Sequence, residues 1–181
     1  IGLGVMGYPM AGHLQAAGHD VCVYNRTSSR AEAWVGQHGG RMALTPAEAA
    51  RGADLVLMCV GNDNDVRAVV YGEQGVLAGM AANTTLIDHT TTSAILAEEL
   101  AARCAEKEVN FLDAPVSGGQ AGAENGRLTI MVGGQALDLM GAEMVLACYG
   151  QRITHVGGHG AGQRCKMVNQ ICIAGILQGV S

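Results

Sequence analysis

Gly2-Leu3-Gly4-Val5-Met6-Gly7 opens the chain as a G-x-G-x-x-G turn, and an amphipathic stretch follows it. In such a turn the first glycine makes the tight bend, the second lets backbone approach a phosphate, and the third lets helix and strand pack closely. Exposed N–H groups and the positive end of the next helix then hold an anion. The stretch therefore predicts a site for a dinucleotide pyrophosphate at the start of an α/β fold.

The residues after this turn support the prediction, which would otherwise be weak because 27 of the 181 residues are glycine. Met10, Leu14 and Ala17 recur at helical spacing, and 21–24 has the pattern of a buried strand. A strand needs about five residues before the glycine turn. We therefore expect most of the first strand, and any targeting peptide, to precede Ile1.

Strand and helix patterns alternate along the rest of the chain. Strands are expected at 41–44, 54–60, 85–88, 110–114, 128–132 and 151–156, and helices at 29–38, 62–70, 93–107, 135–148 and 166–180, with a glycine-rich loop at 115–126. This alternation predicts a doubly wound, mostly parallel Rossmann-type sheet with helices on both faces.

The domain prediction is one nucleotide-binding domain over 1–162, followed by the start of an interdomain helix over 163–181. Apolar residues cover nearly the whole circumference of the last helix, which is typical of a buried helix. This helix therefore needs a partner surface beyond Ser181.

Composition excludes several classes of protein. The net charge is −5 without a Lys/Arg cluster, so we expect no nucleic acid and no acidic membrane surface as partner. The sequence contains no run of about 18 apolar residues, so we expect no membrane-spanning helix. The six cysteines lack C-x-x-C spacing, which favours buried reduced thiols in a cytoplasmic protein, and neither they nor the histidines are spaced as metal ligands.

The end of the second strand bears on the choice of dinucleotide. An NAD-specific site places a carboxylate on the ribose 2′-hydroxyl, but this chain has Asn25, Arg26 and Thr27 there. Arg26 offers a permanently charged donor fork for a 2′-phosphate. We therefore expect NADP to be preferred over NAD.

Four motifs together resemble the β-hydroxyacid dehydrogenases, the family of 3-hydroxyisobutyrate dehydrogenase, tartronate semialdehyde reductase and the glyoxylate/succinic semialdehyde reductases. They are the opening turn, Leu86-Ile-Asp-His-Thr-Thr91, Asp113-Ala-Pro-Val-Ser-Gly-Gly119 with the following 126–134, and Gly160-Ala-Gly-Gln-Arg-Cys-Lys166-Met-Val-Asn169. The resemblance implies NAD(P)-dependent interconversion of a short 3-hydroxy acid and its semialdehyde. It also implies an all-helical C-terminal domain, which would form a homo-oligomer.

The same resemblance assigns roles by matched position. The catalytic lysine of the family falls on Lys166, and its loop for the substrate carboxylate falls on Ser117, Gly118 and Gly119. Asn169 or Gln170 would orient the substrate. Besides the opening turn and 25–27, the cofactor contacts fall on Cys59, Val60, Asn64 and Thr91.

Elementary chemistry agrees with the role of Lys166. Hydride arrival at a carbonyl carbon leaves charge on oxygen, which an ammonium can stabilise and protonate. In the reverse direction the neutral amine takes the proton back, so its reference pKa of about 10.4 has to be lowered. We expect Lys166 in the first turn of the last helix, where the dipole lowers the pKa by less than about one unit, and desolvation to supply the remainder.

Two alternatives remain open at this point. The Val-Ser-Gly-Gly loop and the lysine helix also resemble 6-phosphogluconate dehydrogenase, although a phosphate substrate would need further basic groups. The other alternative is a dinucleotide-binding module that is catalytically idle and used for protein interaction, against which the retained Lys166 argues.

Overall fold

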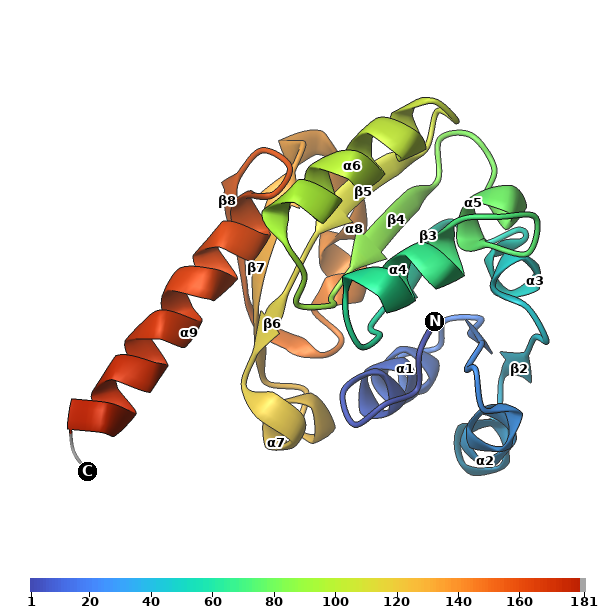
Figure 1. Ribbon diagram of the computed structural model, residues 1–181. Coiled ribbons are helices and arrows are strands. Elements are labelled where there is room, and N and C mark those ends of the chain that lie inside the picture. The colour runs from blue at the N-terminus through green and yellow to red at the C-terminus, as the bar shows by residue number, and fades with distance from the viewer. Residues whose placement is uncertain (180–181) are drawn as a thin grey trace.

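The computed structural model describes residues 1–179, so the last two residues of the predicted interdomain segment, Val180 and Ser181, lie outside the described residues. The chain forms an α/β fold with two sheets (Figure 1). The prediction of a Rossmann-type, mostly parallel architecture is confirmed.

The first part of the chain builds a small parallel sheet flanked by helices. Its elements are α1 (Gly7–Ala16), β1 (Cys22–Val23), α2 (Ser28–His38), β2 (Arg41–Met42) and α3 (Pro46–Ala50). Residue Ile1 joins this part to the next, because its backbone bonds to Leu57 and Cys59 while the N–H of Gly2 donates to the carbonyl of Tyr24. The glycine turn therefore begins between the two sheets.

The larger sheet has six strands. Its elements in chain order are β3 (Leu55–Met58), α4 (Asp63–Val70), α5 (Val76–Gly79), β4 (Thr85–Asp88), α6 (Ala94–Ala105), β5 (Asn110–Asp113), β6 (Val116–Ser117), α7 (Gly119–Glu124), β7 (Leu128–Gly134), α8 (Ala136–Leu146), β8 (Gly150–Gly157) and α9 (Ala161–Gly179). The strands β3, β4 and β5 are parallel and in register, so Met58, Asp88 and Asp113 end at one edge.

β7 reverses direction and pairs with both β5 and β6, and β8 then runs parallel to β7. This geometry carries β6 and the start of β7 past the edge where β4 and β5 end. In Figure 1, α4 and α6 lie in front of the sheet and α8 lies behind it, while α9 runs away from the body toward the C-terminus. The extended β6–β7 pair and α9 thus lie beside the carboxyl ends of the parallel strands.

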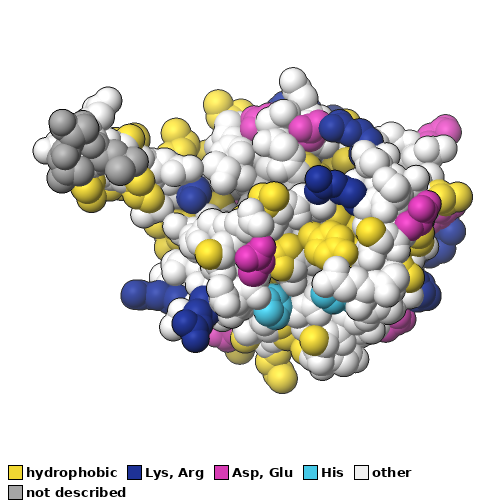
Figure 2. Space-filling view, turned by 90° about the horizontal axis from the view of Figure 1, so that it is seen from below, with side chains coloured by type: hydrophobic (Ala, Val, Ile, Leu, Met, Phe, Trp, Pro, Cys, Tyr) yellow, Lys and Arg dark blue, Asp and Glu magenta, His cyan; other side chains and the backbone are white. Residues whose placement is uncertain are grey.

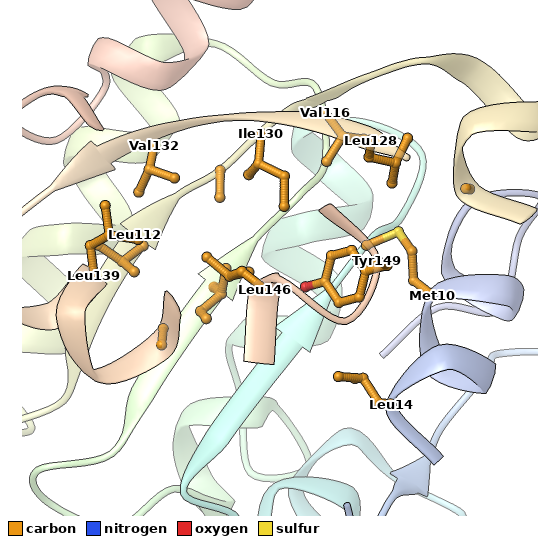
Figure 3. Close-up of a cluster of buried hydrophobic side chains, with 14 residues drawn as sticks. Met10, Leu14, Leu112, Val116, Leu128, Ile130, Val132, Leu139, Leu146 and Tyr149 are labelled. Carbon is orange, nitrogen blue, oxygen red and sulfur yellow. The ribbon is translucent and has the colours of Figure 1, made fainter. Parts of the chain in front are cut away.

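Two apolar cores hold the sheet. One core packs α1, α7 and α8 against β5, β6 and β7, and Figure 3 shows Met10, Leu128, Ile130, Leu146 and Tyr149 meeting there. The other core packs α4, α5 and α6 against the opposite face. Burial of side chains this large stabilises a fold by about 1.5–3 kcal/mol each, so the edge that carries the polar residues rests on a rigid base.

Two local predictions are wrong. The glycine-rich segment 115–126 is not all loop, because β6 and α7 form within it. The last helix begins at Ala161, before both the 163 expected for the interdomain segment and the 166 at which the apolar pattern starts, because N–H groups at its start find an acceptor in Asp113 on β5. Glycine-rich composition hid both elements, since glycine lowers helix and strand propensity and carries no apolar pattern.

α9 exposes apolar side chains, as its nearly all-round apolar sequence pattern predicts for a helix without its partner surface. Exposed apolar side chains line its described part, including Val168 at 61% and Ile171 at 70% of their full area. Figure 2, which views the molecule from below, shows yellow apolar side chains along the projecting helix. The same view shows basic side chains in separate groups rather than in one patch.

Candidate active site

The opening turn has the geometry that its glycines predict. Gly2 lies at a φ of +87°, and a Cβ there would be 2.3 Å from the carbonyl oxygen of Cys59. A Cβ on Gly7 would be 2.0 Å from the carbonyl oxygen of Gly2. A Cβ on Gly4 would meet nothing within 4 Å, so the space beside this residue is open for a ligand.

The positive end of α1 is available to an anion. Met6, which precedes the helix, has no capping side chain, and the first turn carries no acidic residue. Val5 is exposed, whereas the side chain of Leu3 is buried in the small core between α1 and α2. Leu3 therefore offers only its backbone to a ligand.

Residues 25–27, which come shortly after β1, differ in how firmly hydrogen bonds hold their side chains. The side-chain amide of Asn25 accepts from the N–H of Leu3 at 2.9 Å and donates to the carbonyl of Thr27 at 3.0 Å, so it holds the glycine turn in place. Arg26 is exposed, and its guanidinium pairs with Asp65 on α4 at 3.2 Å. The sequence did not single out Asp65, because an acidic residue in the first turn of a helix is common for reasons of the helix dipole alone.

The segments after β3 and β4 meet at the same edge. The N–H of Val60 donates to the hydroxyl of Thr90 at 3.0 Å, and this bond joins the two segments. Asn64 lies exposed in the first turn of α4, and Thr91 is exposed beyond β4. Burial raises the pKa of the Cys59 thiol to about 11, so this side chain stays a neutral thiol at the sheet edge.

Asp88 is a buried carboxyl group at the end of β4. Its Oδ1 accepts from the N–H of Thr90 at 2.8 Å, which fixes the turn after β4. Desolvation by burial raises the pKa of Asp88 to about 7, and the hydrogen bonds from Thr90 oppose that rise. Near neutrality this carboxyl group is therefore partly protonated.

His89 is also buried and serves as a cross-link. Its Nδ1 lies 2.7 Å from the carbonyl oxygen of Ala114 and its Nε2 lies 2.8 Å from the hydroxyl of Tyr149. Burial lowers the pKa of His89 to about 4, so the ring is neutral, donates to Ala114 and accepts from Tyr149. It connects β4, β5 and the end of α8 and faces no solvent.

Lys166 lies on the side of α9 that faces the sheet. Only 8% of its surface is exposed, and among residues 1–179 its ammonium has no hydrogen-bond or ion-pair partner. Desolvation by burial lowers its pKa. Because α9 begins at Ala161, Lys166 is in the second turn rather than the first, and the helix dipole contributes less than expected since its effect falls off within the first turn.

The predicted substrate residues come from two elements. Ser117 ends β6, and Gly118 and Gly119 follow it into α7 with both φ angles positive. The side-chain amide of Asn169, one turn after Lys166 on α9, donates to the hydroxyl of Ser117 at 3.4 Å. Gln170 is exposed. The structure therefore brings Lys166, Asn169 and Ser117 to one place and leaves Gln170 beside them.

A hollow of about 930 Å³ between β1 and β3 is lined in part by Gly2, Gly7 and Cys59, and Lys166 and Ser117 do not line it. In the described part of the chain, His, Cys, Asp and Glu side chains form no group of three or more that could hold a metal ion. Within residues 1–179 no helix is both long enough and apolar enough to cross a membrane. Of the six thiols, only Cys104 is fully buried, and Cys172 is exposed, so the prediction of buried cysteines holds for Cys104 and is wrong for Cys172.

Glycine turn, uncapped helix and sheet edge together define a Rossmann-type dinucleotide-binding domain that has a buried lysine at its rim. Residues 1–157 match the family model described as the NAD binding domain of 6-phosphogluconate dehydrogenase. The chain belongs to this family.

Relatives and solved structures agree with this assignment. An oxidoreductase of Shewanella frigidimarina is 56% identical over the whole chain, which covers 62% of that protein. The 3-hydroxyisobutyrate dehydrogenase of Pseudomonas aeruginosa is 36% identical, again over the whole chain and 60% of the relative. The structure of Mycobacterium tuberculosis 3-hydroxyisobutyrate dehydrogenase with L-serine superposes with a TM-score of 0.90 at 36% identity, over 96% of this chain and 58% of that one. The chain thus spans about three fifths of the relatives it matches.

Proposed function

We propose that the full-length protein is an NADP-preferring oxidoreductase that interconverts a short 3-hydroxy acid and its semialdehyde, with Lys166 as acid and base. The observation that carries this proposal is a largely buried lysine side chain whose ammonium has no protein partner among residues 1–179, one helical turn from an amide that contacts Ser117. The stem of the side chain is held among other residues while its nitrogen stays accessible and unpaired, so the ammonium is available to a ligand oxygen. The 3-hydroxyisobutyrate dehydrogenases among the relatives support the substrate class.

A nicotinamide dinucleotide fits the residues at the glycine turn, where Gly4 leaves open space and no side chain neutralises the end of α1. When bound, it would supply the hydride. Thr91 and Val60 would contact it from the neighbouring strand ends, and Arg26 would bind a 2′-phosphate.

In the reduction direction, Lys166 would donate a proton to the aldehyde oxygen as hydride reaches the carbonyl carbon, which gives the alcohol and a neutral amine. In the oxidation direction, the neutral amine would take the hydroxyl proton as hydride leaves the same carbon. Lowering of the lysine pKa by desolvation helps the second direction. Exclusion of water also strengthens the interaction of the ammonium with the developing alkoxide.

The substrate carboxylate would bind at 117–119. Two consecutive glycines with positive φ let backbone N–H groups converge, and such a concavity holds an anion without a cation. The hydroxyl of Ser117 would add a donor. We favour Asn169 over Gln170 as the residue that orients the substrate, because Asn169 contacts Ser117.

The full-length protein would have a second domain after α9. A helical domain after 163–181 would cover the exposed apolar side chains of α9, complete the substrate pocket and mediate a homo-oligomer in the cytoplasm. Residues 1–162 would act as the nucleotide-binding domain.

The test is NADPH oxidation by the full-length protein with a panel of short aldehydes that carry a carboxylate on the carbon next to the aldehyde. The methyl ester of each aldehyde is the control, because it keeps the carbonyl and loses the anion. We expect turnover with the acids and little with the esters. Binding of NADPH without oxidation by any acid would favour the catalytically idle module instead.

A further inference from the structure

The side chain of Gln163 lies between the two halves of the candidate site. Gln163 is in the first turn of α9 and is fully buried. Its Nε2 donates to the carbonyl of Thr90 at 2.7 Å, and its Oε1 accepts from the N–H of Thr92 at 3.0 Å. The carboxamide therefore grips the backbone on both sides of Thr91.

This arrangement links Thr91, the predicted cofactor contact, with Lys166, the proposed acid and base. Thr91 projects from the gripped segment and is exposed, whereas its neighbours Thr90 and Thr92 are buried. Lys166 follows Gln163 by three residues, which places both side chains on one face of α9. Asp88 and Val60 hold the loop after β4 from the sheet side, and the Gln163 carboxamide ties it to the helix that carries the ammonium.

The start of α9 is held by other contacts that do not need this side chain. Asp113 accepts from the N–H of Gly160 at 2.8 Å and from the N–H of Gln163 at 3.0 Å. Backbone packing is also tight, because a Cβ on Gly162 would be 2.5 Å from the carbonyl oxygen of Met131. Loss of the carboxamide should therefore release the 90–92 loop more than the helix.

We infer that Gln163 is a positioning residue for the hydride transfer, which holds the cofactor-contacting loop at Thr91 in register with Lys166. This inference rests on the proposed function. It assigns Gln163 no contact with the substrate. A small displacement of reacting groups slows a reaction strongly, and a shift of about 1 Å can lower the rate about 100-fold.

The experiment compares Gln163→Met and Gln163→Glu with Gln151→Met in the full-length protein. Methionine matches the length of glutamine but forms no comparable hydrogen bond, and ionised glutamate accepts from Thr92 without donating to Thr90. Gln151 is exposed on β8 and provides the same glutamine-to-methionine change away from the site. The readouts are kcat, the dissociation constant of NADPH, the primary isotope effect with 4-deuterated NADPH, and hydrogen exchange of the 89–93 peptide.

We expect both Gln163 variants to lower kcat about 10- to 100-fold and to raise the isotope effect. NADPH binding should change by less than about threefold, which is under 1 kcal/mol. Exchange of the 89–93 peptide should become faster, whereas Gln151→Met should leave all four readouts unchanged. Gln163→Met keeps the volume and buries no charge, so it should fold even if Gln163→Glu does not.

Two failures can be told apart. A parent protein with turnover, together with folded Gln163 variants of unchanged kcat and isotope effect, overturns the positioning role alone. A parent protein that oxidises NADPH with no carboxylate-bearing aldehyde overturns the proposed function, and the positioning role with it. Unchanged exchange at 89–93 in a folded variant overturns the grip on the loop in either case.

Discussion

At the scale of single residues, the glycine turn separates the requirements of the fold from those of the ligand. Gly2 and Gly7 are needed by the protein, because side chains there would collide with backbone carbonyls. Gly4 meets no neighbour, so its lack of a side chain serves nothing inside the described chain. The three positions of one motif should therefore respond differently to the same substitution.

We expect Gly4→Ala to leave the melting temperature unchanged and to weaken NADPH binding by about tenfold or more, which corresponds to about 1.4 kcal/mol. Gly2→Ala should instead destabilise the protein by about 1–3 kcal/mol from its positive φ alone, with the collision at Cys59 in addition. Thermal unfolding and NADPH titration measure the two effects. A Gly4→Ala protein with the affinity of the parent would contradict a phosphate at this position.

Asp88 makes a prediction about pH. Its pKa is about 7 in the folded protein and about 3.9 in an unfolded chain. Between these values the folded state retains a proton that the unfolded state has lost, so this group lowers the free energy of unfolding as pH rises from 4 to 7. The loss is complete above the folded pKa and amounts to at most about 4 kcal/mol.

Asp88→Asn removes this titration. The free energy of unfolding of the variant, measured relative to that of the parent by urea denaturation, should therefore increase steadily from pH 4 to pH 8. Neutral His89 acts in the opposite direction, because its lowered pKa costs stability below pH 6.5, and it is present in both proteins. If the free energies of unfolding of parent and variant changed in parallel with pH, Asp88 would not be the source of the predicted loss of stability.

At the scale of elements, α9 depends on an acceptor from another strand. Asp113 receives two N–H groups at the start of the helix although it lies on β5. Desolvation raises its pKa, and these hydrogen bonds oppose the rise. The carboxylate thus acts as a capping group supplied across the sheet edge.

Asp113→Asn should lower the free energy of unfolding by about 1–3 kcal/mol. The amide carries no negative charge, and its NH₂ group would face one of the two backbone N–H groups that the carboxylate accepts. Thr45→Ala, which removes the N-cap of the short helix α3, is the matched control and should cost about 1 kcal/mol. Urea denaturation compares the two variants. An Asp113→Asn cost smaller than that of Thr45→Ala would contradict the cross-sheet cap.

Elements with strong apolar patterns were predictable from sequence, and those that depend on distant partners were not. The strand at 85–88 was predicted with its observed bounds, because its run of four residues is too short for a helix and alternates along the chain with helical patterns. The start of α9 and the β6–α7 segment were missed, since their stabilising partners lie on other strands. Lys166 and Ser117 were assigned to the candidate site only through the family motif. Gln163 and Asp65 gave no signal of their own because their partners are more than 30 residues away.

At the scale of the whole molecule, the cofactor edge is shared between the two sheets. Arg26 follows β1 of the small sheet, and Asp65 belongs to α4 of the large one. The ion pair between them is largely exposed and is worth at most about 1 kcal/mol. It can therefore yield to a 2′-phosphate, which would exchange one anionic partner of Arg26 for another.

Arg26→Ala should raise the KM for NADPH about 10- to 100-fold, since hydrogen bonds to charged groups contribute about 1.5–3 kcal/mol, and should leave the KM for NADH nearly unchanged. Asp65→Asn should act in the opposite direction by removing a competing carboxylate. Arg152→Ala, at an exposed arginine on β8, controls for loss of charge. Equal effects of Arg26→Ala on both coenzymes would contradict the NADP preference.

If the ammonium of Lys166 meets the reacting oxygen, its loss should show in the steady-state turnover of Lys166→Met measured beside that of Lys107→Met. Lys107 lies at an exposed position after α6, so its variant carries the same loss of charge away from the site. We expect Lys166→Met to lower kcat about 10²- to 10⁴-fold, as loss of a general acid does. NADPH binding should persist, and Lys107→Met should behave as the parent. A Lys166→Met protein that turns over at the rate of the parent would show that Lys166 is not the acid and base of the reaction.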